Sequence, residues 1–540
     1  MAKYEGPHFI VELGLLALEQ QIMEIEKFFF CAEKMYNKTL FFVQKQYYLM
    51  INNNEYKNYL NLYIDTKKEL EKCNTNLINL NKDLNNCNDK LIKQNLKKNI
   101  KELKDLIKTL TENKKEYSEK LKEIRLNYGL SKNSLEKYIN VQRNKSFQGT
   151  LDVHTTQKIA FRVWKSAEDV IFGDGKRFHY KHNDLDSIES KSNESGIRFD
   201  KDTLCLKFKN LVIPVRARKN DKYLKEALKN EIALCRIKRK PFKKGYKYFI
   251  QIVFKGIPPK KDNLKLGKGS VGIDLGTSTI AAVGNKQIVF KALAPNVNKY
   301  NKRITLLQRK IERSLRTNNK ECFKEDGTIK KGAKLKKTKN CEKLIKELKN
   351  EYRLRSLYIR DFHNKLANEI LSLGNEFITE NMNFKALQKR AKKTERSEKS
   401  SEIKQKDGTI KTIQKFKKKK RFGKSINNHS PGILIRTIET KLSYFGKQLT
   451  KVNTYKYRAS QYHHDTDTYE KVKLSERYKT IESIIVQRDL YSAFLLKNKL
   501  DLETIDRLKC KEEFKKFVKL HNELMKELKT KTDLPKCMGI

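Results

Sequence analysis

Hydrophobic residues recur at helical spacing in the first part of the chain. From Leu15 to Tyr128 there is no Gly or Pro, which permits long helices. Within this stretch apolar residues recur at alternating steps of three and four, the seam of a coiled coil, at Leu70, Cys73, Leu77, Leu80, Leu84, Cys87 and Leu91. The seam resumes in a new phase at Leu96, Ile100, Leu103, Ile107 and Leu110. Both a helical hairpin that turns near Gln94 and one long helix with a stutter account for the break.

Further along, the periodicity changes from helical to alternating. Residues 137–172 keep a helical spacing with one apolar face and contain the only tryptophan, Trp164. Residues 203–217 and 245–256 then alternate apolar with polar or basic side chains, as half-buried antiparallel strands do. This pattern predicts a small β domain with a basic outer face.

The second half of the chain combines short apolar segments with basic helices. Residues 257–270 have the Pro, Gly and charge content of a linker. Residues 391–428 are dense in lysine and predict a loop, either disordered or ordered by nucleic acid. The other predicted elements are a strand pair ending near Leu293, helices over 298–370 interrupted by an exposed basic loop at 324–338, a strand at 376–381, a helix at 432–445 and a strand at 449–452.

The net charge of the chain restricts the kinds of partner that it is expected to bind. Its 540 residues hold 119 Lys and Arg against 64 Asp and Glu, a formal net charge of +55. Neutralising phosphates releases their condensed counterions, so nucleic acid is the expected partner. No apolar run reaches spanning length, and Glu12 interrupts the first one, so neither a membrane nor a signal peptide is expected and a cytoplasmic location is predicted. The nine scattered cysteines indicate reduced thiols.

Three acids occupy positions where a carboxylate is costly. Asp274 ends the strand VGID, Glu380 ends FITE, and Asp489 precedes the apolar run LYSAFLL. Like charges gathered at one sheet edge repel one another unless cations neutralise them. Oxygen ligands suit hard cations, so Mg²⁺, with Mn²⁺ as a substitute, is expected at a two-metal site for phosphodiester hydrolysis.

Asp489 alone also has a structural interpretation as a helix cap or turn former, and Glu380 alone indicates almost nothing, whereas the specific turn at Asp274 favours a function by itself. The order of Asp, Glu and Asp on strand, strand and helix strengthens the prediction of a metal site. The turn Asp-Leu-Gly-Thr at Asp274 occurs in two enzyme classes, because actin-like ATPases use such a turn to wrap phosphate with backbone amides. The mid-chain position of the turn and the cationic composition favour the metal.

Several segments resemble TnpB, the transposon-encoded RNA-guided DNA endonucleases, and the related type V CRISPR effectors. The segments VGIDLGTS, FITENMNFKAL and VQRDLYSAFLL resemble the three RuvC segments of the family in order and spacing. LQRKIERSLR and RDFHNKLANEIL resemble its bridging helices. CAEKMYNKTL and TTQKIAFRVWKSAEDVIFG resemble helices of its recognition lobe, and TLCLKFKNLVIPVRA resembles its wedge strands. The coiled coil looks like an insertion.

The resemblance implies a multidomain protein that joins all-α and α/β parts: a helical recognition lobe, a small antiparallel β wedge and an RNase H-like (RuvC) nuclease. The implied boundaries are a first wedge strand at 1–14, a recognition lobe at 15–172 with the coiled-coil hairpin at about 56–126, the wedge at 173–268, the nuclease with its bridging helices at 269–459, a target-loading insertion at 460–487, the third RuvC segment at 488–500 and a helical tail at 501–540.

The resemblance also implies site residues and partners. Asp274, Glu380 and Asp489 would bind the catalytic Mg²⁺ ions, and guide RNA and target DNA would be the partners, with a monomer favoured. Arg488 would either contact the scissile phosphate or form a structural salt bridge. The basic-helix residues implied to contact nucleic acid are Arg309, Arg313 and Arg316.

The chain departs from the family in one segment and leaves other functions open. Family members often carry two Cys-x-x-Cys pairs before the third acid, whereas residues 460–487 have no cysteine. The neighbouring His463 and His464 would point to opposite faces of a strand, so no zinc is expected. A catalytically silent RNA-guided binding protein, a transposition accessory factor and an architectural nucleic-acid-binding protein are the alternatives. The coiled coil would either grip the guide in place of a second protomer or mediate dimerisation.

Overall fold

A computed structural model of the chain divides into two compact units, each treated by itself. It describes residues 6–540 except 88, 174, 176, 244, 261–263, 326, 389–395, 405–409, 417–421, 472, 474 and 532–533. Residues 1–240 and 246–257 form the N-terminal unit, and residues 241–245 and 258–540 form the C-terminal unit. No helix within the described ranges is long and apolar enough to cross a membrane.

The N-terminal unit is built on a seven-stranded sheet. Its central strand, β1 (His8–Leu15), pairs antiparallel with β7 (Gly245–Lys255) and with β5 (Leu211–Arg216). The alternating stretches at 203–217 and 245–256 thus lie in strands. The strand order is β2-β6-β7-β1-β5-β4-β3, with β2 at Ser187–Glu189, β3 at Arg198–Asp200, β4 at Cys205–Phe208 and β6 at Ile232–Phe242.

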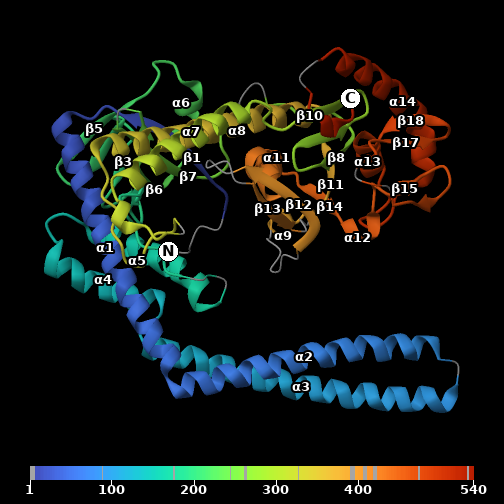
Figure 1. Cartoon of the computed structure of the whole chain (residues 1–540), viewed down its shortest axis with the longest axis horizontal. Helices are drawn as coiled ribbons and strands as arrows, with labels where there is room; N and C mark the ends of the chain where they lie inside the picture. The colour runs from blue at the N-terminus through green and yellow to red at the C-terminus, as the bar shows by residue number, and fades with distance from the viewer. Residues whose placement is uncertain are drawn as a thin grey trace. The chain divides into compact units, whose positions relative to one another are not determined.

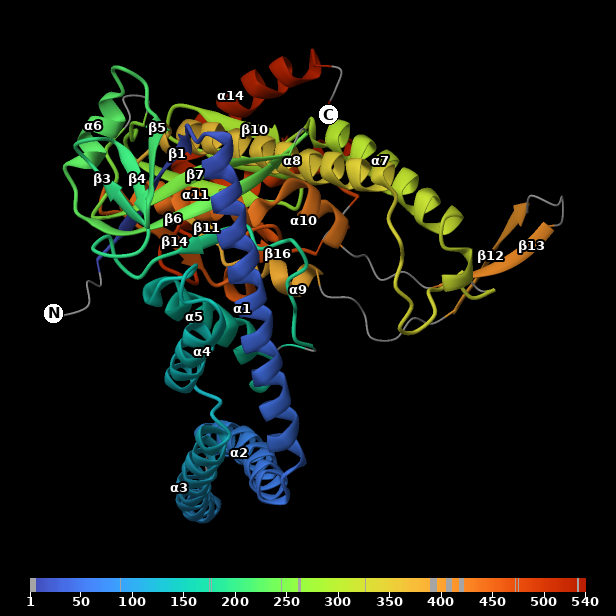
Figure 2. The ribbon, with the colours of Figure 1, turned by 90° about the vertical axis from the view of Figure 1, so that its left-hand side faces the viewer.

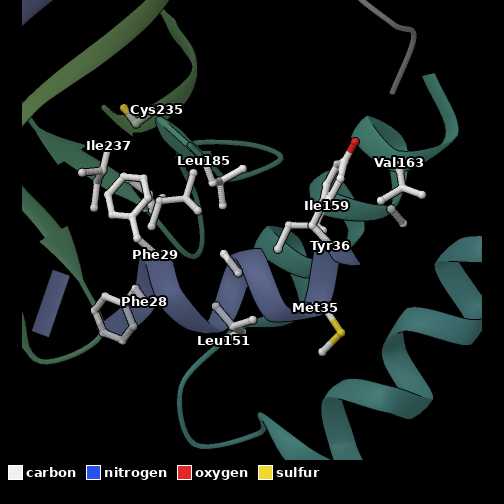
Figure 3. Packing of buried hydrophobic residues seen from close by; sticks show 14 of the residues in the cluster. Phe28, Phe29, Met35, Tyr36, Leu151, Ile159, Val163, Leu185, Cys235 and Ile237 are labelled. Atoms are coloured by element: carbon white, nitrogen blue, oxygen red, sulfur yellow. The ribbon is translucent and has the colours of Figure 1, made fainter. Parts of the chain in front are cut away.

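Helix α1 (Glu19–Asn52) supplies much of the core that covers this sheet. Figure 3 shows Phe29 of α1 next to Ile237 of β6, and Tyr36 next to Ile159 of α5. The helical stretch expected at 137–172 is two helices, α4 (Lys132–Ser146) and α5 (Val153–Ile171). The break arises because the Asp152 side chain accepts a hydrogen bond from the backbone of Thr155 and caps α5. A short helix, α6, spans Lys222–Leu228.

The coiled-coil seam forms a hairpin of two helices, α2 (Asn54–Asn86) and α3 (Lys90–Asn127), which lie side by side in Figures 1 and 2. The chain reverses before Lys90 and not near Gln94. The reason is local, because the Asp89 side chain accepts hydrogen bonds from the backbone amides of Leu91 and Ile92 and starts α3 there. Leu91, placed in the seam by its spacing, is 73% exposed, whereas Leu70, Cys73 and Leu110 form the buried contact.

The C-terminal unit is built on a five-stranded mixed sheet in the order β10-β9-β8-β11-β14. Strand β8 (Ser270–Leu275) pairs antiparallel with β9 (Thr279–Val283), which pairs antiparallel with β10 (Ile288–Ala292). Strand β11 (Glu376–Glu380) runs parallel to both β8 and β14 (Leu449–Val452). The strands expected around residues 274, 378 and 450 therefore share one sheet.

Helices cover both faces of this sheet. Leu366 of α8 (Lys339–Leu371) and Leu434 of α11 (Pro431–Ser443) pack on the face that carries Val271, Ile273 and Leu275. The short helix α13 (Arg488–Lys497) packs on the opposite face and is backed by α14 (Arg507–Lys529). Helix α7 (Val297–Thr317) lies along α8.

Smaller elements complete the C-terminal unit. Part of the expected lysine-rich loop is ordered, because β12 (Arg396–Lys404) pairs with β13 (Ile410–Phe416) on either side of Asp407-Gly408, a dipeptide typical of hairpin turns. The lysine run at 417–420 lies outside the described residues. The other elements are α9 (Phe384–Gln388), α10 (Gly423–His429), α12 (Thr454–Tyr457), β15 (Tyr462–His463), β16 (Thr468–Tyr469), β17 (Tyr478–Ile481), β18 (Ile484–Gln487) and short 3₁₀ helices at Lys320–Cys322 and Lys536–Met538.

Gly272 in β8 gives the first testable prediction. A methyl group there would lie 1.9 Å from the Ala493 carbonyl oxygen and 2.3 Å from the Lys497 backbone nitrogen, so Gly272→Ala has to push α13 off the sheet. We expect a loss of about 1–3 kcal/mol of stability, seen as a lower midpoint in thermal unfolding of the full chain.

The matched control is Gly432→Ala in α11. Its added methyl would meet only the Phe384 ring, at 3.6 Å, and alanine favours a helix over glycine. Equal midpoints for the two variants would contradict the close contact between β8 and α13.

Candidate active site

Strand alternation places two of the three predicted acids on the same face of the sheet. In β8, Val271, Ile273 and Leu275 face α8 and α11, so Gly272 and Asp274 face α13. In β11, Phe377 belongs to the α8 face and Ile378 to the α13 face, so Glu380 follows Ile378 toward α13. Continuing the parallel register of Thr379 with Ile273 by one residue sets Glu380 beside Asp274, on strands about 4.8 Å apart.

The third acid reaches this edge on α13. The Gln487 side chain accepts a hydrogen bond from Leu490 N and caps the helix, so Asp489 lies in its first turn. The positive end of the helix dipole favours a carboxylate there. Because Gly272 has no side chain, α13 lies against the strand that carries Asp274.

The three acids line one cavity of about 840 Å³. The structure thus brings together residues separated by more than a hundred positions in the sequence. The turn between β8 and β9 forms one wall, closed by a hydrogen bond from Gly276 N to Thr279 O, and Ser425 of α10 donates a hydrogen bond to Thr277 O. The lining residues outside the acids and this turn are Met382, Phe422, Ser460, Gln461, Lys471, Ser475, Arg477, Arg488 and Cys537.

Two of the three acids in this cavity have raised pKa values. The pKa of Asp274 lies well above its ordinary value, first because the protein removes the carboxyl group from water and then because Asp489 and Glu380 lie nearby; Arg488 offsets part of this rise. Loss of hydration also raises the pKa of Glu380 to about 7, opposed by a hydrogen bond from the backbone of Ala459. Both effects penalise negative charge at this point of the cavity.

Arg488 forms the salt bridge that was one of its two predicted roles, and a contact with the scissile phosphate stays a prediction. The residue is 8% exposed, and its guanidinium Nη1 donates a hydrogen bond to Glu476 O at 2.9 Å. Nη2 lies 3.3 Å from Asp489 Oδ1. The guanidinium thus ties the start of α13 to the segment before β17, even though it also lines the cavity.

The oxygen atoms of the three carboxylates in this cavity are the type of ligand that a hard cation such as Mg²⁺ prefers. As placed, the carboxylates do not converge: no group of three or more His, Cys, Asp and Glu side chains among the described residues is gathered closely enough to hold a metal ion. Asp489 is held by Arg488 instead. Holding an ion between the three acids therefore requires their carboxylates to move closer together.

The sequence patterns did not identify the basic side chains that line this cavity. Lys471 and Arg477 line it, but they belong to a segment without a recognisable motif, so only the folded chain reveals them. Cys537 was also missed; its Sγ lies 3.5 Å from Ser278 Oγ. The C-terminal segment is held there because Tyr478 donates a hydrogen bond to Gly539 O.

The other candidate residues lie outside the cavity lining. Arg309 and Arg313 are exposed on α7, and Arg316 pairs with Glu312 and covers the Phe323 ring. His464 is fully buried, and its Nδ1 lies 2.8 Å from the Tyr491 hydroxyl. His463 lies in β15, with Nε2 3.7 Å from Glu470. The two histidines thus contact different partners.

Comparison with known proteins gives weak signals. No protein-family profile matches the chain, and no curated protein matches it. A Cas12f1–sgRNA–target DNA complex aligns at 11% identity over 91% of this chain and 99% of that chain, with a TM-score of 0.40. A CRISPR–Cas12f ternary complex aligns at 10% identity over 68% and 74%, with a TM-score of 0.24. Scores this low carry no conclusion about this chain, so its function is argued from its own residues.

Glu380 predicts a specific pH dependence. Its folded-state pKa of about 7 exceeds the ordinary value of 4.5, so between these two pH values the folded protein holds a proton that the unfolded chain has released. Glu380 therefore makes stability fall as the pH rises from about 4.5 to 7, with no further loss above. Glu380→Gln removes this contribution, so in EDTA the variant should lose less stability than the wild type between pH 5 and pH 8, measured by thermal unfolding.

Glu376→Gln is the control, because Glu376 lies exposed at the other end of β11. We expect it to follow the wild-type pH dependence. If Glu380→Gln also followed the wild type, the burial of this carboxyl group would be disproved.

Proposed function

We propose that the chain is an RNA-guided DNA endonuclease whose hydrolytic site is the cavity lined by Asp274, Glu380 and Asp489. The observation that carries the proposal is that these acids come from two adjacent parallel strands and one helix and line a single cavity. Nothing in the packing of the core requires three carboxylates at this edge, and the raised pKa values of Asp274 and Glu380 indicate that their negative charge is unfavourable there. A group that is costly for folding and gathered in a cavity is a candidate for chemistry.

The sheet supports an RNase H-like assignment for the C-terminal unit. Three consecutive antiparallel strands, β8 to β10, are followed by β11 and β14, which are added parallel on the other side of β8. The first acid lies on the central strand and the second on its parallel neighbour. This is the arrangement expected from the resemblance of VGIDLGTS, FITENMNFKAL and VQRDLYSAFLL to the RuvC segments.

In the proposed reaction the three carboxylates hold the metal, and the cations of the cavity hold the nucleic acid. Mg²⁺, when bound, would activate water and stabilise the leaving oxygen of the phosphodiester. Lys471 and Arg477 face the same cavity and would bind phosphates on either side of the scissile bond. Arg488, which pairs with Asp489 Oδ1, would keep this carboxylate oriented at the site.

The partners follow from charge and from the family resemblance. A formal charge of +55 suits guide RNA and target DNA together, held through their phosphates, while base pairing would select the target. The ATPase alternative is disfavoured, because the Asp-Leu-Gly-Thr turn lies mid-chain, after a β domain, in a strongly cationic protein. A silent RNA-guided binding protein would have no use for three costly acids.

Asp274→Asn gives the central test. We expect it to lose cleavage of a guide-matched plasmid by at least about 100-fold in Mg²⁺, since the variant removes a charge that the site needs, and to keep its affinity for co-purified RNA. Calorimetric titration of Mn²⁺ into the RNA-free protein should show weaker binding than in the wild type. The substrate is a plasmid library with randomised flanking sequence, so that any flanking motif is found at once.

Glu439→Gln is the matched control on α11. This substitution also removes one carboxylate from the C-terminal unit, but Glu439 pairs with Lys451 and is absent from the lining of the three-acid cavity. Cleavage by Asp274→Asn at the wild-type rate would disprove the site, and RNA-dependent DNA binding without cleavage by the wild type would favour the silent protein.

A further inference from the structure

A second cavity lies within the N-terminal unit, at the base of the α2–α3 hairpin. It has a volume of about 1100 Å³. Four helices wall it: the end of α1, the first half of α2, the second half of α3, and the end of α5 with the following Phe172 and Gly173. Val170 to Gly173 belong to the segment that resembles a recognition-lobe helix, whereas no lining residue belongs to the three segments that resemble the RuvC nuclease.

Aromatic rings line this cavity from three sides. Tyr47 comes from α1, Tyr56 and Tyr63 from α2, and Phe172 follows α5. Burial raises the pKa of both Tyr47 and Tyr56, whereas Phe172 is 59% exposed. An aromatic side chain left this exposed beside a cavity is available to a flat ligand.

The cavity is also strongly cationic, with five basic residues against the single carboxylate of Glu119; the basic residues are Lys67, Lys114, Lys115, Lys122 and Arg125. Two of these cations are close to the rings. The Arg125 guanidinium lies 4.9 Å from the Phe172 ring centroid, and Lys114 Nζ lies 6.0 Å from that of Tyr63.

Arg125 carries an unused donor. Its Nε is buried and has no hydrogen-bond partner among the described residues. A buried donor without an acceptor is costly, and an acceptor on a bound molecule would remove the cost. Rings, cations and an unpaired donor thus converge on one cavity.

We propose that this cavity binds an unpaired nucleotide of RNA, with its base stacked on Tyr63 or Phe172 and its phosphates held by Lys114, Lys122 and Arg125. Aromatic faces bind unpaired bases of any sequence, and neighbouring cations bind the backbone. A paired base would not be available for stacking. The cavity also offers hydroxyl and carboxylate partners for a ribose 2′-hydroxyl, from Thr111, Ser118 and Glu119.

This inference rests on the proposed function only in taking RNA as the polyanion. The cavity uses neither the three acids nor a metal. A chain that cleaves DNA in Mg²⁺ but fails the binding test below would lose only this inference, and a chain that passes it without cleaving would lose only the nuclease assignment.

The test is photo-crosslinking of the full-length protein in EDTA to a single-stranded RNA oligonucleotide that contains 4-thiouridine. Mass spectrometry then locates the crosslinked peptides, which distinguishes this cavity from other basic surfaces. We expect crosslinks on the peptides that contain Tyr63 and Phe172, and an about 10-fold lower yield there in Phe172→Leu. Leucine keeps an apolar side chain at an exposed position, so folding is preserved and is checked by thermal unfolding.

Tyr48→Leu is the matched control, because Tyr48 is 51% exposed on α1 next to Tyr47 but is absent from the cavity lining. It should leave the yield unchanged. Crosslinks that avoid both peptides, or equal losses in Tyr48→Leu and Phe172→Leu, would overturn the proposal. Equal yields with the same sequence as DNA would overturn the assignment to RNA.

A charge-matched pair of variants tests the phosphate contacts. Lys114→Ala with Lys122→Ala should reduce the salt dependence of crosslinking by about 1.4 in log–log slope, at about 0.7 per phosphate contact. Lys101→Ala with Lys104→Ala removes the same charge from exposed positions on α3 outside the cavity lining and should change the slope little. The same change in both double variants would mean general attraction to the hairpin and would overturn the site.

Discussion

The contact between α13 and β8 is the constraint on which the candidate active site depends. At Gly272 the helix backbone lies so close to the strand that no side chain fits between them. This contact holds the second half of α13, from Ala493 to Lys497, against the strand that carries Asp274, and Asp489 lies one turn before it on the same helix. Because the helix is short, a shift at Gly272 would be passed directly to Asp489.

The same packing makes the negative charges of the buried acids unfavourable in the folded protein. Asp274 and Glu380 lie where water is displaced by α13 and by the turn after β8, so that their carboxylates favour protonation. Arg488, which lines the same cavity, forms an ion pair with Asp489. Divalent cations would neutralise all three acids and add Lewis acidity at the same point. The proposed chemistry and the raised pKa values therefore have one cause.

The two units use positive charge in different ways. In the C-terminal unit, Lys471 and Arg477 line a cavity that also holds acids, so a phosphate there would be drawn toward the proposed site of hydrolysis. In the N-terminal unit, the cavity at the base of the hairpin combines cations with exposed rings and has one carboxylate. A mixed acidic and basic cavity suits reaction at phosphorus, whereas an aromatic and basic one suits binding of an unpaired base.

The sequence by itself predicted the strands at 203–217 and 245–256, the strands around residues 274, 378 and 450 and the long helices, and it singled out the three acids, because these inferences depend on local periodicity and on residues next to one another. Alternation in VGIDL already directs Asp274 away from Val271 and Ile273, and the spacing of Leu70, Cys73 and Leu110 marks the hairpin seam. The turn position was wrong because the capping by Asp89 outweighs the hydrophobic phase. Within the expected lysine-rich loop, β12 and β13 pair with each other despite their polar composition.

Only the tertiary structure decided which residues share a cavity. Lys471, Arg477 and Cys537 carry no local signal, and they reach Asp274 because the β17–β18 hairpin and the C-terminal segment pack beside α13. The sequence does not predict the aromatic cavity either, because its lining residues come from four separate segments, as Tyr47, Tyr63, Arg125 and Phe172 do. Periodicity reports the face that a residue presents, whereas a site requires faces from distant segments to meet, and that depends on the packing of the whole unit.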